Sequence, residues 1–125
     1  MRKALLIEDE ESCRTMMAAI LSDYDIEVEA YQDPTLFLKK TGKCPSVDVI
    51  LTDNRMPNMT GLDFLQRIDE MGCDIPPVNR AVISGDLTSR DLNRIKELGI
   101  RFFHKPCSID EIYDWLTEIG IISEN

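Results

Sequence analysis

The chain has 125 residues, of which 43% are hydrophobic, and this fits one globular domain with a single core. Its formal net charge of −9 repels a phosphate backbone, so we expect no direct binding to nucleic acid. The apolar run near the N-terminus, Ala4–Ile7, is too short for a secretory signal, and a membrane span needs about 18 apolar residues. We therefore expect a cytoplasmic protein without membrane association.

The four cysteines are widely spaced and form no Cys-x-x-Cys pair: Cys13, Cys44, Cys73 and Cys107. With only one histidine in the chain, a zinc site is disfavoured. We predict reduced thiols in or near the core, with a redox switch as the alternative.

The N-terminal half alternates between short apolar runs and residues at helical spacing. A strand over Ala4–Ile7 is followed by a helix around residues 13–21 and by a more polar strand over Ile26–Ala30, which suggests a sheet edge. Asp33 and Pro34 are a helix-start signal for a short helix that runs through Lys40. The continuous apolar run Val47–Thr52 predicts a buried strand.

The C-terminal half continues the alternation. A helix is predicted over Gly61–Met71, a strand over Ala81–Ser84, a helix over Thr88–Leu98 and a strand over Ile100–His104. Ser108 is expected to cap the last helix. Five strand–helix units in succession predict an α/β fold, the flavodoxin-like (βα)5 type. Its five-stranded parallel sheet would have the order 2-1-3-4-5, with helices on both faces.

Chemically active residues follow four of these strands: Glu8 and Asp9, Asp53, Ser84, and Lys105. In an open α/β sheet the carboxyl ends of the strands form the ligand-binding edge. Acids, a hydroxyl and an ammonium at one edge suit a metal ion and a phosphoryl group. Taken singly, each has a simpler explanation: helix N-terminal acids, a Ser-Gly turn and a solvated lysine.

Together, in this order, these motifs resemble the response-regulator receiver domain of two-component signalling. The residues that carry the resemblance are Glu8-Asp9, the loop from Asp53 through Met56-Pro57 to Gly61, Ser84-Gly85, Phe102 and Lys105-Pro106. The resemblance covers Lys3 to about Gly120, so residues 1–125 are expected to form one receiver domain without an output domain.

The resemblance implies that Asp53 accepts a phosphoryl group from a phosphohistidine on a sensor histidine kinase or a histidine phosphotransfer protein. Mg²⁺ would be bound by Asp9, Asp53 and the main-chain carbonyl of Arg55, and Glu8 would hold a metal-bound water. Lys105 would pair with Asp53 and then with the phosphoryl oxygens. Its strand-end position suggests that replacing it would leave the fold intact.

In the resembling family, Ser84 would then move to the phosphoryl group and Phe102 would swing inward behind it. The face of residues 88–98, 100–104 and the last helix would change its preference for a downstream effector or output domain. A phosphorylation-dependent homodimer is left open. For Trp115 the pattern leaves partner contact and core packing equally open.

The predicted function is a phosphorylation-activated signalling switch, not a separate turnover enzyme. The alternatives are a receiver-like interaction module that works without phosphorylation and an enzyme acting on small phosphate esters. Arg55 and Asp86 follow Asp53 and Ser84 by two residues each. We hypothesise that they form an ion pair that gates water at the phosphorylated site, against the alternative of two solvated charges.

Overall fold

The computed structural model describes residues 1–123 and confirms the predicted sheet. Its parallel strands lie in the order β2-β1-β3-β4-β5. They are β1 (Lys3–Ile7), β2 (Glu27–Tyr31), β3 (Val49–Asp53), β4 (Arg80–Ser84) and β5 (Arg101–His104). The helices are α1 (Glu11–Asp23), α2 (Pro34–Thr41), α3 (Gly61–Glu70), α4 (Ser89–Leu98) and α5 (Ile109–Glu118), with a 3₁₀ turn, η1 (Pro77–Asn79).

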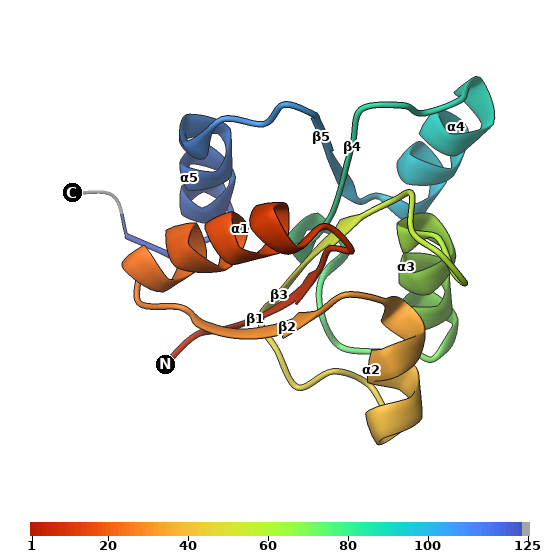
Figure 1. The fold of residues 1–125 in the computed structure, drawn as a ribbon, viewed down its shortest axis with the longest axis horizontal. Coiled ribbons are helices and arrows are strands. Elements are labelled where there is room, and N and C mark those ends of the chain that lie inside the picture. Colours follow the sequence, from red (N-terminus) through yellow and green to blue (C-terminus); the bar gives the residue numbers. More distant parts are fainter. Residues whose placement is uncertain (124–125) are drawn as a thin grey trace.

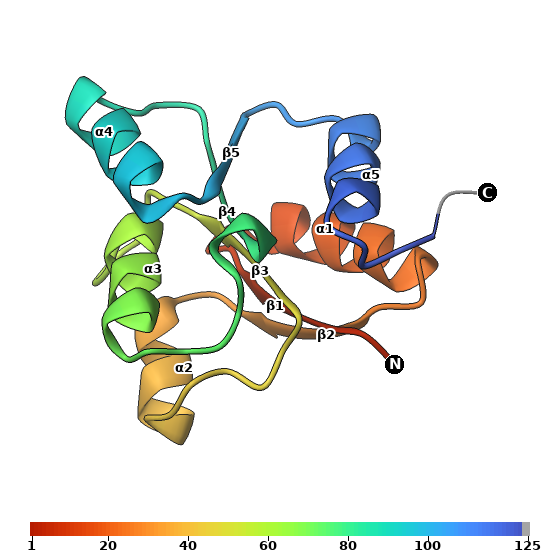
Figure 2. The ribbon, with the colours of Figure 1, turned by 180° about the vertical axis from the view of Figure 1, so that it is seen from behind.

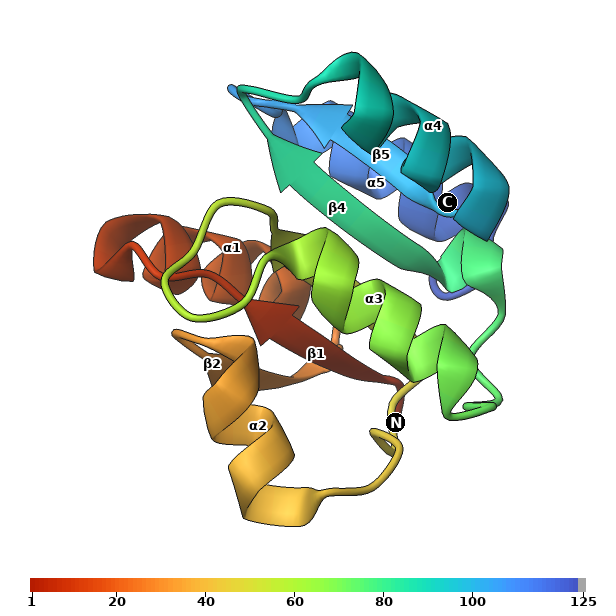
Figure 3. The same ribbon diagram turned by 90° about the vertical axis from the view of Figure 1, so that its right-hand side faces the viewer.

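The sheet separates two buried apolar clusters. Helices α1 and α5 lie on one face and α2, α3 and α4 on the other (Figures 1 and 2). Figure 3 looks onto the second face, with α2, α3 and α4 in front of the strands. Because successive strand residues point to opposite faces, Ala4 and Leu6 pack with α1 and α5, whereas Leu5 and Ile7 pack on the other side.

The helix starts agree with the capping signals in the sequence. The side chains of Asp33 and Ser108 accept hydrogen bonds from main-chain amides in the first turns of α2 and α5. Strand β3 begins at Val49 rather than Val47, because Asp48 uses its main-chain N–H and its carboxylate to bind the main chain of Lys3 at the edge of the sheet.

The prediction of reduced cysteines is wrong for two of the four. Cys44, in the loop before β3, forms a disulfide with Cys73, in the loop after α3, while Cys13 and Cys107 are free. The two loops meet at the amino-terminal edge of the sheet, opposite the strand ends that carry the acids. A separation of 29 residues leaves no local signal for this proximity.

Trp115 belongs to the core. Its side chain is 1% exposed and packs edge-on against Phe103, with ring centroids 5.4 Å apart. Its indole N–H donates to the carbonyl of Val78 in η1 at 3.0 Å, so the segment before β4 fastens α5 to the sheet. Among the described residues, every helix is too short or too polar to span a membrane.

Candidate functional site

The carboxyl ends of four strands bring the predicted residues to one edge of the sheet. Glu8 and Asp9 follow β1, Asp53 ends the neighbouring strand β3, Ser84 ends β4, and Lys105 follows β5. Strands β1 and β3 are adjacent although a whole strand and two helices separate them in the chain. This is the point where the strand order reverses, the usual place for a ligand site in such sheets.

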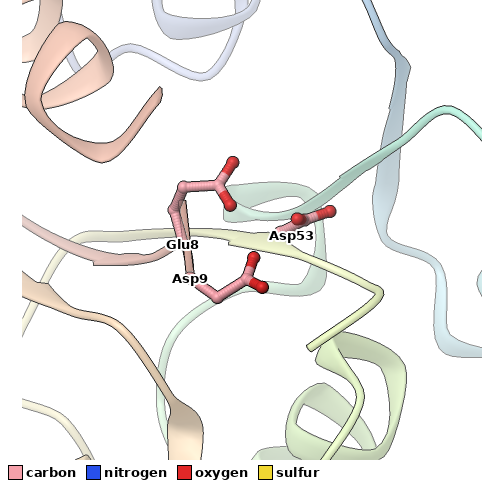
Figure 4. Close-up of side chains that lie close together, drawn as sticks. All are labelled: Glu8, Asp9 and Asp53. Atoms are coloured by element: carbon pink, nitrogen blue, oxygen red, sulfur yellow. The ribbon is translucent and has the colours of Figure 1, made fainter. Parts of the chain in front are cut away.

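Three carboxylates gather at this edge. Glu8, Asp9 and Asp53 each offer one oxygen, and these oxygens all lie within 4.8 Å of one another. Figure 4 shows the carboxylates of Glu8 and Asp9 turned toward Asp53. Glu8 and Asp53 are buried and Asp9 is exposed. Loss of water around Asp9, and next the neighbouring Glu8, raise the pKa of Asp9 above its ordinary value.

The donor set fits Mg²⁺. Around this ion, octahedral oxygen ligands at about 2.1 Å stand roughly 3 to 4 Å apart. The three oxygens within 4.8 Å need only a small contraction, or one water between ion and carboxylate, to reach that geometry. Hard carboxylate oxygens are the ligands that Mg²⁺ prefers.

Lys105 supplies the cation that holds this cluster together. Its Nζ lies 2.9 Å from Glu8 Oε1 and 3.2 Å from Asp53 Oδ2. Burial lowers the pKa of Lys105, but the hydrogen bonds and charges of Glu8 and Asp53 outweigh it and raise the pKa above its ordinary value. Lys105 is therefore an ammonium at neutral pH, beside the carboxylate predicted to react.

The end of β3 is fixed by bonds that sequence reasoning missed. The Asn54 main-chain N–H donates to Asp53 Oδ1 at 2.8 Å, and the buried Asn54 side chain accepts from the N–H of Leu62 at 3.1 Å. Gly61 lets α3 start against this turn, because a Cβ there would stand 2.0 Å from the Asp53 carbonyl oxygen. Gly61 was part of the motif recognised in the sequence. The role of Asn54 could not be predicted, because its partner Leu62 comes close only once the loop has folded.

Ser84 ends β4 at the edge that carries the carboxylates, and Phe102 lies in the neighbouring strand β5. Ser84 is buried, and its hydroxyl oxygen accepts from the N–H of Asp86 at 3.2 Å. Phe102 is half-buried against the cluster on the α2–α3–α4 face, and its ring centroid is 6.2 Å from that of His104. Their movement on phosphorylation stays a prediction.

Arg55 and Asp86 lie together at the mouth of the site. The Arg55 guanidinium forms an ion pair with Asp86 Oδ2, 3.0 Å away, which joins the β3–α3 loop to the β4–α4 loop. The side chains are 76% and 66% exposed, so the pair is worth about 0 to 1 kcal/mol. The geometry of the hypothesised gate is present, and its effect on water stays a prediction.

Comparisons with known proteins agree on one family. Residues 4–117 match the family described as response regulator receiver domain. Two-component response regulator ORR5 from Oryza sativa subsp. japonica is 30% identical over 111 residues, which is 86% of this chain and 81% of that protein. Response regulator protein TmoT from Ectopseudomonas mendocina is 30% identical over 103 residues, 81% of this chain but only 44% of TmoT.

Solved structures show the same architecture. Chemotaxis protein CheY4 of Vibrio cholerae superimposes with a TM-score of 0.78 at 26% identity, covering 95% of this chain and 98% of that one. The N-terminal domain of an uncharacterized protein from Wolinella succinogenes gives a TM-score of 0.80 at 27% identity, covering 97% and 95% of the two chains. A two-component response regulator from Clostridium difficile, at 13% identity, shares the fold with a TM-score of 0.83 and coverage of 97% of each chain.

Proposed function

Because the chain belongs to the response regulator receiver domain family, which acts in phosphorylation-based signalling, we propose that it is a phosphorylation-activated switch with Asp53 as the phosphoacceptor. The observation that carries the proposal is the position of Asp53. It is a buried carboxylate between two further acids and the Lys105 ammonium, 3.2 Å away.

The chemistry needs charge neutralisation more than a base. Asp53 Oδ1 accepts from the main-chain N–H of Asn54 and Oδ2 contacts Lys105, and one of these carboxylate oxygens attacks the phosphorus of a phosphohistidine. A P–O bond forms, the P–N bond breaks, and the imidazole of the donor leaves with that electron pair. Lys105 already contacts this carboxylate, and its ammonium can move to bind the phosphoryl oxygens as negative charge arrives there.

Mg²⁺, held by Asp9, Asp53 and the Arg55 carbonyl, would supply further neutralisation of the transferring group. Glu8 would orient a water on the ion. Protonation of Asp9 would weaken cation binding. Because the pKa of Asp9 is raised, this weakening would begin at a higher pH than for an ordinary aspartate as the pH falls. The domain assists its own phosphorylation and dephosphorylation and is not a separate turnover enzyme.

The phosphorylated state would be read through the face of α4, β5 and α5. Ser84 would donate its hydroxyl hydrogen to a phosphoryl oxygen, and Phe102 would move inward. The donor would be a cytoplasmic sensor histidine kinase or histidine phosphotransfer protein, and the reader a downstream effector, an output domain or a second copy of the domain. Phe103 and Trp115 are buried, and the half-buried Phe102 would leave the surface as it moves inward, which would change the face that the reader contacts.

The test is incubation with phosphoramidate and Mg²⁺, followed by intact mass. We expect a phosphate-sized mass gain that disappears in Asp53→Asn, because the amide is not a nucleophile at neutral pH. Asp48→Asn, at the opposite edge of the sheet, is the matched control and should still gain mass. No gain in the wild type would favour an interaction module without phosphorylation, and steady turnover of phosphate esters would favour an enzyme.

We also propose that the Arg55–Asp86 pair lengthens the life of the phosphorylated form by obstructing the attacking water. The pair is exposed, so its loss changes the activation free energy by about 1 kcal/mol at most. Since about 1.4 kcal/mol corresponds to a tenfold change in rate, Arg55→Ala should speed dephosphorylation only several-fold. Dephosphorylation rates of Arg55→Ala, Asp86→Ala and the double variant isolate the coupling. If the effects of the two single substitutions on the rate are strictly additive in the double variant, the proposed gate is contradicted.

A further inference from the structure

Asp33 lies outside the acidic cluster, at the start of α2, and no motif of the site includes it. Its side chain is buried, at 7% exposure. One oxygen, Oδ1, accepts from the main-chain N–H of Thr35 at 2.7 Å and from its hydroxyl at 2.8 Å, so that Asp33 caps α2. The other oxygen, Oδ2, takes no part in these capping bonds.

Oδ2 accepts a hydrogen bond from the side-chain amide of Asn58 at 2.5 Å. Asn58 belongs to the loop 54–60, which joins Asp53 to α3, and it has a positive φ of 73°. Left-handed backbone is uncommon outside glycine and is retained where the surroundings determine it. A carboxylate acceptor makes this bond stronger than a neutral one.

Besides the apolar packing of Met56 and Met59, two polar side-chain contacts join the middle of this loop to other elements. The Arg55–Asp86 pair is exposed at both ends, whereas the Asn58–Asp33 bond has a buried acceptor anchored on a helix cap. Burial raises the pKa of Asp33, but the bonds from Asn58 and Thr35 lower it further, so the net pKa is below its ordinary value. The acceptor is therefore a carboxylate at neutral pH.

We propose that Asp33 is a positioning residue for phosphoryl transfer to Asp53. By holding Asn58, it fixes the loop that presents the Arg55 carbonyl to the cation beside Asp53. The inference rests on the proposed function, since it assumes that this carbonyl is a ligand. Asp33 touches neither the cation nor the phosphoryl group. It acts through the backbone of residues 55–58, as groups behind metal ligands commonly do.

Two substitutions separate this role from helix capping. Asp33→Ser keeps a good N-cap but is too short to reach Asn58. Asp33→Asn keeps the cap and can pair with Asn58 once the Asn58 amide turns to present its oxygen. Both variants should retain the helical signal and the cooperative melting of the wild type, so differences at the site arise from the link to the loop.

The first readout is Mg²⁺ affinity without any phosphodonor, from amide shifts or calorimetry. We expect Asp33→Ser to bind Mg²⁺ roughly 10-fold more weakly than the wild type, the lower end of the usual range for groups behind metal ligands, and Asp33→Asn to stay near the wild type. Amide exchange at Arg55 and Asn58 in metal-free protein should be faster in Asp33→Ser. Equal Mg²⁺ affinities and equal exchange in all three proteins would overturn the proposal.

The second readout is a rescue. Asn58→Asp sets two carboxylates against each other and should slow phosphoramidate-driven phosphorylation at fixed, subsaturating Mg²⁺. Asp33→Asn combined with Asn58→Asp restores one donor and one acceptor and should recover most of the rate. Absence of recovery contradicts the role of the pair. If the wild type gains no phosphate, the proposed function fails, and the Mg²⁺ affinities still decide whether Asp33 positions the loop.

Discussion

Reduction of the Cys44–Cys73 disulfide is expected to lower the free energy of unfolding by about 3 to 4 kcal/mol. The bond closes a loop across 29 residues, and the chain-entropy relation for a loop of that length gives this magnitude. It joins the segment before β3 to the segment before β4. The buried Arg80 guanidinium also donates to the carbonyl of Cys73 there, at 3.2 Å, so the native loop is held in place after reduction. Reduction therefore acts mainly by raising the conformational entropy of the unfolded state.

Urea unfolding with and without a thiol reductant measures the effect. Cys13→Ser/Cys107→Ser removes the two free thiols and should keep the full dependence on reductant. Cys44→Ser/Cys73→Ser should match the reduced wild type and ignore the reductant. Unfolded wild-type protein kept without reductant should titrate two thiols, and a count of four would show that the bond is absent.

Much of the fold and site follows from local signals in the chain. The branched apolar run Val47–Thr52 predicts a buried parallel strand, and alternation with helical patterns predicts a parallel sheet, for which the flavodoxin-like order was expected and is confirmed. Once that order is known, Glu8, Asp9 and Asp53 must meet, because residues just past the carboxyl ends of neighbouring parallel strands lie side by side.

Contacts between distant loops leave no such signal. Cys44 and Cys73 lie in separate loops, and Asp33 meets Asn58 across 25 residues. Each residue has a sufficient local explanation: a buried thiol, a helix cap or a turn. The burial of Trp115 was open for a related reason, since its partner Val78 belongs to a 3₁₀ turn that no apolar period marks.

Lys105→Met is expected both to slow phosphorylation and to reduce stability, which revises the sequence-based expectation that only function would suffer. The ammonium lies against two buried carboxylates, Glu8 at 2.9 Å and Asp53 at 3.2 Å. Methionine keeps the apolar stem and leaves both charges without a cation. We expect a loss of about 2 kcal/mol, between the values for exposed pairs and for fully buried ones, because Lys105 is partly exposed.

The pH dependence identifies the cause. In the wild type the pKa of Lys105 is raised above 10.5, so its stabilisation is present at every lower pH and is lost only as pH rises through the folded pKa. In Lys105→Met that contribution is missing, so the difference in stability from the wild type is present at neutral pH and closes only as pH rises through the folded pKa of Lys105. Mg²⁺ should also restore stability, because it replaces the missing cation.

Urea unfolding from neutral to alkaline pH, with and without Mg²⁺, measures the stability, and intact mass over time measures phosphorylation by phosphoramidate. The rate should fall about 100-fold, the usual cost of one donor that stabilises charge in a transition state. Lys96→Met, on the exposed side of α4 and without an ion pair among the described residues, is the matched control and should change neither quantity. A Lys105→Met protein as stable as the control at neutral pH would mean that water, rather than the ammonium, neutralises Glu8 and Asp53.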